Sequence, residues 1–276
     1  MKGKCDDFDL SHGKNMKSIL SISILGGQLQ ISSYGAFACL GFLFAMLLVY
    51  YRIMVIPQIT FKKYLALVGF IVAGIFVGSK FVFIVTMIPN IVNEFSFAKL
   101  GYIILTSGFV FYGGLMGAIL GMYLFGRKFN IRFKELSNVV TPAFPLFHMF
   151  GRLGCFFGGC CYGKASSWGI AMEADPTVLR IPVQLFESAF CLLLTIFLLV
   201  LSRKGKSQRW LIKWYLSIYA VGRFAFEFLR GDEIRGIWFG LSTSQWISLA
   251  IICALFIREF VIKNKKSSPN YAIITK

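Results

Sequence analysis

Long apolar stretches separated by short polar segments make up most of the chain. A hydrocarbon core about 30 Å thick requires about 20 apolar residues in each spanning helix. Six stretches come close to or exceed that length: Tyr34–Tyr51, Tyr64–Ile88, Leu100–Phe125, Val183–Leu201, Trp210–Leu229 and Ser244–Ile262. A seventh stretch, Leu136–Phe157, is interrupted by proline, histidine and arginine residues. The pattern predicts a seven-helix bundle in a membrane.

The composition favours a membrane protein over a soluble one. Hydrophobic residues make up 57% of the 276 residues, charged residues make up 15%, and the mean hydropathy is +0.71. Soluble domains are about 45–50% apolar and about 25% charged, and a soluble fold of this size could not bury the excess. Seven cysteines are too few for a disulfide scaffold. Disordered and disulfide-rich secreted proteins are therefore excluded.

The net charge of +17 is typical of a nucleic-acid-binding protein, but the positions of the charges argue against that function. Lys and Arg cluster between the apolar stretches, with seventeen on one side of the predicted membrane and ten on the other. Because positively charged connections stay in the cytoplasm, we expect the amino terminus outside, the carboxyl terminus in the cytoplasm and no nucleic-acid partner.

We expect one membrane domain with a short extension at each end. Residues 1–33 are expected to form an external arm, residues 34–262 the seven helices, and residues 263–276 a cytoplasmic basic tail. A segment of the chain, about residues 158–182, is expected to lie outside the membrane. The predicted fold class is therefore all-α, with a glycine-rich loop and small external elements.

Charged residues within the apolar stretches are candidates for function, because charge is costly to place in lipid. These residues are Lys80, Arg152, Glu187, Arg223 and Glu227. Arg223 and Glu227 are four residues apart and can pair on one helix face, which Arg230 continues. Such a pair either fixes helix packing or lets Glu227 hold Arg223 against an anion, since the guanidinium fork matches phosphate oxygens.

Residues 151–164, Gly-Arg-Leu-Gly-Cys-Phe-Phe-Gly-Gly-Cys-Cys-Tyr-Gly-Lys, combine glycines with an arginine. Glycines let the backbone approach a ligand closely, and a fixed Arg152 among them is typical of a cradle for a lipid phosphate. A re-entrant turn would explain the glycines but not the arginine. A second glycine pattern, Gly113, Gly117 and Gly121, recurs every four residues and predicts close helix packing beside Tyr112.

Three cysteines lie in the same segment: Cys155, Cys160 and Cys161. The spacing Cys-x4-Cys-Cys is not a standard zinc motif, and a disulfide from Cys155 to either of the others fits an oxidising exterior better. Burial is the commonest state of a cysteine. We expect burial for the cysteines of the other apolar stretches, Cys39, Cys191 and Cys253. No metal and no cofactor are expected.

Residues 151–163 resemble G-R-x-G-N-F-x-N-G-E-x-x-G, the central signature of the prolipoprotein diacylglyceryl transferase family. Further segments are similar to that family's motifs in the same order: Ser33-Tyr34-Gly35, Gly78-Ser79-Lys80, Phe111–Gly117, Pro182–Glu187, Tyr219–Arg230 and Leu241–Gln245. The resemblance covers most of the chain.

The resemblance implies a reaction at the outer face of the bacterial cytoplasmic membrane. The diacylglyceryl group of phosphatidylglycerol moves to the lipobox cysteine thiol of a prolipoprotein, giving a thioether and glycerol phosphate. Carbon–oxygen cleavage leaves a phosphate anion that fixed cations stabilise, and Arg152 and Arg223 are expected to do so. The other substrate-binding residues implied are Tyr34, Gly113, Gly114, Gly154, Gly159, Gly163, Tyr219, Glu227 and Arg230.

The departures from the family pattern concern the residues that handle protons. Tyr112 replaces a histidine, and an unperturbed tyrosine pKa of about 10 makes it a poorer base. Cys155 and Cys160 stand where the family has asparagine and glutamate. His148, one helical turn before Arg152, is either a replacement base or a packing residue.

Two other functions fit the same residues. A divergent relative could lipidate another nucleophile, or a non-catalytic membrane protein could bind or transport phospholipid in the same pocket. The absence of an inverted repeat in the sequence weighs against a transporter.

Overall fold

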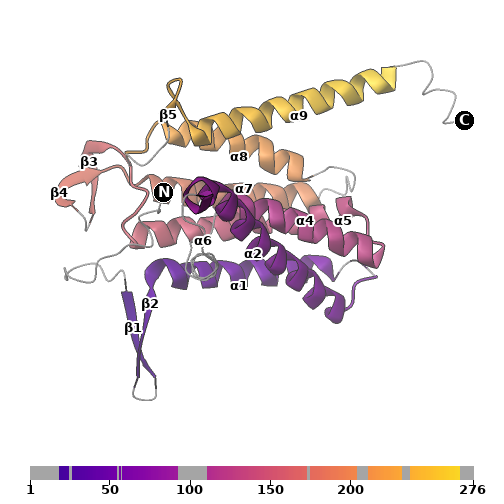
Figure 1. The fold of residues 1–276 in the computed structure, drawn as a ribbon, viewed down its shortest axis with the longest axis horizontal. Coiled ribbons are helices and arrows are strands. Elements are labelled where there is room, and N and C mark those ends of the chain that lie inside the picture. The colour runs from indigo at the N-terminus through magenta and orange to yellow at the C-terminus, as the bar shows by residue number, and fades with distance from the viewer. Residues whose placement is uncertain are drawn as a thin grey trace, which may run out of the picture. The chain divides into compact units, whose positions relative to one another are not determined.

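The structure, a computed structural model, describes residues 19–24, 27–54, 56, 58–92, 111–172, 175–203, 211–231 and 237–267 (Figure 1). The helices in these ranges are α1 (Ser33–Ile53), α2 (Phe61–Val92), α4 (Phe111–Phe129), α5 (Phe133–Val140), α6 (Ala143–Phe157), α7 (Val183–Arg203), α8 (Leu211–Glu227) and α9 (Thr243–Ser267). Helix is therefore the main secondary structure, as the apolar pattern predicts.

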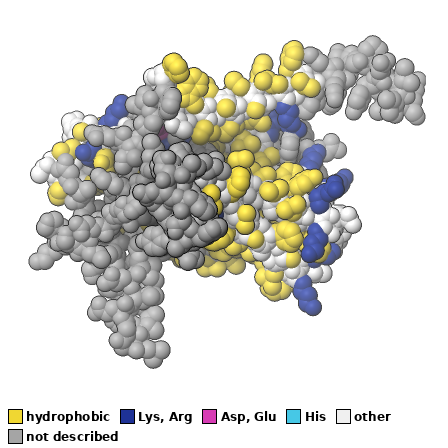
Figure 2. All heavy atoms as spheres, in the orientation of Figure 1, with side chains coloured by type: hydrophobic (Ala, Val, Ile, Leu, Met, Phe, Trp, Pro, Cys, Tyr) yellow, Lys and Arg dark blue, Asp and Glu magenta, His cyan; other side chains and the backbone are white. Residues whose placement is uncertain are grey.

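Four helices of the described part are long and apolar enough to cross a membrane: Ser33–Ile53, Phe61–Ile84, Val183–Arg203 and Thr243–Val261. Figure 2 shows hydrophobic side chains over much of the visible helical surface. Exposed apolar surface of this extent is suited to lipid rather than water. The chain is a membrane protein, and the count of seven spans stays a prediction.

The remaining three predicted spans are represented less completely. α8 has 17 residues, about 26 Å at 1.5 Å per residue, which is shorter than the hydrocarbon core. The first part of the stretch 100–125 lies outside the described residues, which resume with α4. The interrupted stretch 136–157 is divided between α5 and α6.

The break between α5 and α6 has a local physical cause. Pro142 precedes α6 and has a φ of −64°, which suits the start of a helix, where its missing N–H is not needed. The backbone carbonyl groups at the end of α5 accept hydrogen bonds from the Arg52 side chain. Its Nε donates to the Val139 oxygen at 3.0 Å and its Nη2 to the Asn138 oxygen at 2.9 Å. The break is thus stabilised by hydrogen bonds that a continuous helix would not require.

Three antiparallel hairpins show that the prediction of an all-α fold was incomplete. They pair β1 (Ile19–Ile24) with β2 (Gly27–Ser32), β3 (Ala165–Met172) with β4 (Asp175–Arg180), and β5 (Ile237–Trp238) with β6 (Leu241–Ser242). The first hairpin corresponds to an alternation of apolar and polar residues, Ile-Leu-Ser-Ile-Ser-Ile and Gly-Gln-Leu-Gln-Ile-Ser, which is typical of strands. This alternation predicts strands, but the sequence interpretation assigned these residues only to an external arm.

The described residues group into two compact units, one within residues 44–140 and one within residues 14–43 and 141–276. In the first unit, α2 packs closely on α4. A Cβ on Gly113, Gly117 or Gly121 would overlap the backbone of α2. The prediction of close packing along this glycine ridge is therefore confirmed.

This close approach predicts a position-dependent effect of alanine in α2. A Cβ on Gly74 would overlap the Gly117 carbonyl oxygen, whereas a Cβ on Gly69 meets nothing within 4 Å. We expect Gly74→Ala to lower the free energy of unfolding by about 1–3 kcal/mol through overpacking. Gly69→Ala, the matched control, is expected to be neutral or stabilising by up to about 1 kcal/mol. Thermal unfolding in detergent measures both, and equal midpoints would contradict the packing.

In the second unit, α6, α7 and α8 pack side by side, and α9 lies along α8. A buried cluster of Leu194, Leu198, Leu211 and Tyr215 joins α7 to α8. Cys191 is buried as predicted, but Cys39 and Cys253 are exposed. The prediction for these two was wrong because an apolar helix in lipid does not need to bury every apolar side chain in protein.

Candidate functional site

Four charged side chains from α6, α7 and α8 form one buried network. Glu187 accepts from both arginines: its Oε2 lies 2.5 Å from Arg152 Nε and its Oε1 lies 2.9 Å from Arg223 Nη1. Arg223 Nη2 also lies 2.9 Å from Glu227 Oε2. The side chains of the arginines are 12% exposed and those of the glutamates 7% and 2% exposed. Two positive and two negative charges therefore neutralise one another within the protein.

The local sequence explains how each helix contributes to this charge network. Arg223 and Glu227 pair at the i and i+4 positions of α8, as predicted. On α7, Gln184, Glu187 and Ser188 are all buried and lie on the same face. The Ser188 hydroxyl donates to the Met149 carbonyl oxygen at 3.2 Å, which fixes α7 against α6 where Arg152 lies. Glu187 was expected as a charge within a span and as part of the Pro182–Glu187 motif, but its position between two arginines was not predicted.

The two guanidinium groups differ in how many of their donors are already used. Arg152 Nε donates to His148 Nε2 at 3.2 Å and contacts Glu187, whereas its Nη1 and Nη2 donate to no other described residue. Arg223 uses both Nη atoms: Nη1 donates to Glu187 Oε1, and Nη2 donates to the Ser244 hydroxyl at 3.1 Å. Nη2 also forms an ion pair with Glu227 Oε2. Arg152 therefore offers the forked edge that can bind a planar or tetrahedral oxyanion.

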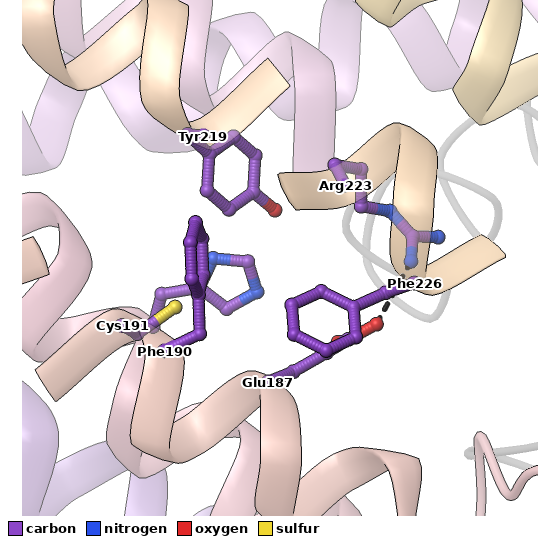
Figure 3. Close-up of a pocket in the computed structure, with 7 residues that line it drawn as sticks. Glu187, Phe190, Cys191, Tyr219, Arg223 and Phe226 are labelled. Atoms are coloured by element: carbon purple, nitrogen blue, oxygen red, sulfur yellow. Dashed lines mark hydrogen bonds and ion pairs between the residues drawn. The ribbon is translucent and has the colours of Figure 1, made fainter. Parts of the chain in front are cut away.

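A small pocket lies beside the charge network, between α7 and α8. Figure 3 shows Glu187, Phe190 and Cys191 on α7 facing Tyr219, Arg223 and Phe226 on α8, and His148 also lines the space. Its volume of about 10 Å³ is room for about one water molecule. Burial and the aromatic walls exclude bulk water from this space, and in such a low dielectric constant charge interactions are strong.

His148 and Tyr219 lie together on one side of this pocket. Their ring centroids are 5.3 Å apart, and Tyr219 stacks on Tyr215 with centroids at 5.6 Å. Because His148 Nε2 accepts the Arg152 N–H, its imidazole holds the guanidinium as well as facing the pocket. The predicted residues Arg152, Arg223, Glu227, His148 and Tyr219 are thus brought together by the fold.

The glycine-rich segment continues from α6 toward β3. A Cβ on Gly154 would lie 3.2 Å from Tyr34 Cα and 3.2 Å from Phe37 Cβ, so α1 and α6 approach closely here. Gly159 has a φ of +66°, a left-handed conformation that favours glycine. The predicted residues Gly154, Gly159 and Tyr34 therefore lie at the carboxyl-terminal end of α6, and Tyr34 itself is 46% exposed.

Gly163 connects the glycine-rich segment to the start of α7 and the end of α8 through backbone hydrogen bonds. Its backbone pairs with Arg230 in an isolated β-bridge, and its N–H donates to the Ile181 oxygen at 3.0 Å. A Cβ on Gly163 would overlap that same oxygen. Gly163 thus fixes the ends of α7 and α8 relative to the loop, and Arg230, which is 7% exposed, lies at this junction.

The three cysteines of the glycine-rich segment, Cys155 in α6 and Cys160 and Cys161 after it, are not disulfide-bonded. The disulfide considered for Cys155 is therefore not what the structure contains. Their Sγ atoms all lie within 4.8 Å of one another. Gln184 ties this loop to α7, since its Nε2 donates to the Cys160 carbonyl oxygen at 2.7 Å.

Three predicted residues lie in the other unit. Tyr112 is the second residue of α4, and its side chain lies outside the described part of the structure. Gly113 and Gly114 are buried against α2. Conversely, the sequence interpretation did not assign a role to Glu187, Gln184 or Ser244, although Glu187 was marked as a charge within a span.

Comparison with known proteins agrees with this arrangement of motifs. The sequence profile of the family described as prolipoprotein diacylglyceryl transferase matches residues 20–260. The chain belongs to the prolipoprotein diacylglyceryl transferase family.

Curated relatives cover nearly the same length. A phosphatidylglycerol–prolipoprotein diacylglyceryl transferase of Clostridium tetani is 38% identical over 245 residues, covering 83% of this chain and 92% of the relative. The second such enzyme of Clostridium perfringens is 37% identical over 232 residues, covering 81% and 88%. A relative from Dehalococcoides mccartyi is 27% identical over 249 residues, covering 87% and 92%. The resemblance identified from the motifs is therefore confirmed.

Proposed function

We propose that this protein transfers the diacylglyceryl group of phosphatidylglycerol to the cysteine thiol of a prolipoprotein. Support comes from the family and from the names of its relatives. The observation that carries the chemistry is the free forked edge of Arg152 beside a charge-neutral network. A bound phospholipid phosphate would accept from Nη1 and Nη2 while Nε keeps its contact with Glu187.

This geometry suits cleavage of the bond between the glycerol carbon and the phosphate oxygen. The thiol sulfur attacks that carbon, the carbon–oxygen bond breaks, and the electron pair stays on the phosphate oxygen. Arg152 and Arg223 stabilise this developing charge in a site with a low dielectric constant. A phosphate is larger than a pocket of about 10 Å³, so we expect headgroup binding to move Phe190 or Phe226, whose rings close the space at 5.5 Å.

The proposal extends to the membrane and to the substrates. We place the protein in the bacterial cytoplasmic membrane with seven spans, the amino terminus outside and the carboxyl terminus in the cytoplasm. The bias of seventeen to ten in Lys and Arg supports this orientation. The acceptor is the lipobox cysteine of a prolipoprotein signal peptide, which arrives from the outer face, while phosphatidylglycerol enters laterally from the membrane.

Complementation tests this function directly. The gene is expressed in a bacterium depleted of its own diacylglyceryl transferase, and a lipobox reporter is analysed by mass spectrometry. We expect the reporter to gain one diacylglyceryl group on its cysteine. A reporter left unmodified by well-inserted protein would contradict the proposal. A lipid on another nucleophile, or bound phospholipid without transfer, would favour the divergent lipidating enzyme or the non-catalytic protein, respectively.

The His148 contact predicts how two substitutions differ. Since Nε2 accepts from Arg152, His148→Ala should lower turnover about tenfold by removing a hydrogen bond to a charged group. In His148→Gln the amide oxygen can accept the same bond, so most turnover should return with an unchanged pH profile. If His148 were instead the base for the thiol, both variants would lose about 10²- to 10⁴-fold. Initial rates across pH in proteoliposomes distinguish the two roles.

A further inference from the structure

The free thiols of Cys155, Cys160 and Cys161, here called the cysteine cluster, have the spacing of a metal site. Their Sγ atoms lie within 4.8 Å of one another. Tetrahedral zinc with bonds of about 2.3 Å holds its sulfur ligands about 3.8 Å apart. Each Sγ–Sγ distance would have to shorten by about 1 Å at most for zinc to bind. A disulfide bond of about 2.05 Å would require a much larger movement.

The backbone holds the cysteine cluster at some energetic cost. Cys161 has a φ of +60°, a conformation that costs a non-glycine residue about 1–2 kcal/mol. The Cys160 N–H donates to the Cys155 carbonyl oxygen at 3.1 Å, and Gln184 binds the Cys160 oxygen from α7. Strained residues that are held in place in this way occur preferentially at ligand sites.

Charge also favours a cation among these sulfurs. A divalent ion would reduce the charge of three thiolates from −3 to −1, and Arg152, whose charge Glu187 already balances, lies close enough to Cys155 and Cys161 to interact electrostatically with both. In the described residues, no His, Asp or Glu side chain joins the three thiols in this cluster. Three sulfur ligands leave one tetrahedral position for a water molecule or a substrate, as in catalytic rather than structural zinc sites.

We propose that the cysteine cluster binds a zinc ion whose fourth position takes the thiol of the prolipoprotein. This inference rests on the proposed transfer reaction and names the group that activates its nucleophile. It also revises the expectation of no metal, which rested on the spacing along the chain rather than on the distances in space.

The site would supply a thiolate without a protein base. The substrate S–H bond breaks as sulfur binds zinc, and the proton leaves with the displaced water into solvent. The coordinated sulfur would then form its bond to the glycerol carbon as the carbon–oxygen bond breaks, with the electron pair staying on the phosphate oxygen, and a water molecule would return to the metal position once the thioether leaves. Cys155 follows Arg152 by three residues on α6, a separation of about 5–6 Å between Cβ atoms. The nucleophile and the leaving phosphate would therefore meet within one helical turn.

Metal content tests the site independently of the reaction. The full chain is purified in detergent, and zinc is measured by mass spectrometry for the wild type and for Cys160→Ser, Cys161→Ser and Cys253→Ser. We expect about one zinc per chain in the wild type and in the Cys253→Ser control, whose cysteine is exposed on α9. The other two variants should retain less than about a tenth. Wild-type protein without zinc, or with a disulfide in this loop, would overturn the proposal.

Cobalt substitution tests the fourth ligand. A lipobox peptide should strengthen the thiolate-to-cobalt absorption of the cobalt-loaded protein, and the same peptide with serine for cysteine should not. Removing zinc with a chelator should lower reporter lipidation at least tenfold, and added zinc should restore it. Identical spectra with both peptides, or full activity without metal, would refute thiol activation. The untreated protein's lipidation of the reporter decides separately whether the transfer reaction itself is correct.

Discussion

Replacing Arg152 with lysine is expected to lower diacylglyceryl transfer by about 100- to 1000-fold, the usual cost of losing one preorganised donor to developing negative charge. Lysine keeps the positive charge but replaces the planar fork with a point charge. It also loses the arrangement in which Nε contacts His148 and Glu187 while Nη1 and Nη2 remain for a phosphate. The measurement is kcat/KM for a lipobox reporter in phosphatidylglycerol proteoliposomes.

The matched control for this substitution is Arg132→Lys. Arg132 pairs with Glu135 at the protein surface, where the arginine side chain is 84% exposed. We expect the turnover of the Arg132→Lys variant to stay within about twofold of the wild type. A fall in kcat, rather than a rise in KM alone, would place the contact in the transition state. Wild-type turnover in Arg152→Lys would mean that the arginine only supports the loop.

Replacing Glu187 with glutamine should cause the largest loss of stability. This carboxylate neutralises two buried guanidinium groups, and breaking a buried charge pair from one side costs about 3–5 kcal/mol. For a chain of this size such a loss lowers the unfolding midpoint by about 6–20 °C. Heating in detergent with a thiol-reactive dye measures it in protein whose exposed Cys39 and Cys253 are replaced by serine, because the thiol of Cys191 is buried on α7 until the bundle opens.

Two further variants separate charge balance from a general loss of packing. Glu259→Gln makes the same change in an exposed pair with Lys213 at 2.9 Å, and it should alter stability by less than about 1 kcal/mol. Glu187→Gln combined with Arg223→Gln removes one charge of each sign, so it should cost less than the two single changes added together. Additive losses would show that the two residues do not act as an ion pair.

The helical core and one ion pair could be predicted because both depend on local spacing. Arg223 and Glu227 lie on one face of α8 because residues four apart do so in any α-helix. The glycines of α4 recur every four residues, and this pattern predicts close helix packing. The first hairpin was missed although its alternating pattern was present, since these residues were interpreted as an external arm without assigned strands. The exposed positions of Cys39 and Cys253 were missed because lipid replaces protein as their surroundings.

The sequence alone determined that the chain belongs in a membrane, that Arg152 lies in a glycine-rich segment, and that its motifs follow those of one enzyme family, whereas the structure places Arg152 in the last turns of α6 rather than in a loop. Periodicity, composition and motif order are properties of the chain itself. Only the tertiary structure decided that Glu187 joins Arg152 to Arg223 and that three cysteines gather within 4.8 Å. Contacts between α6, α7 and α8 depend on which helix faces pack together, and spacing within a single helix does not specify that choice.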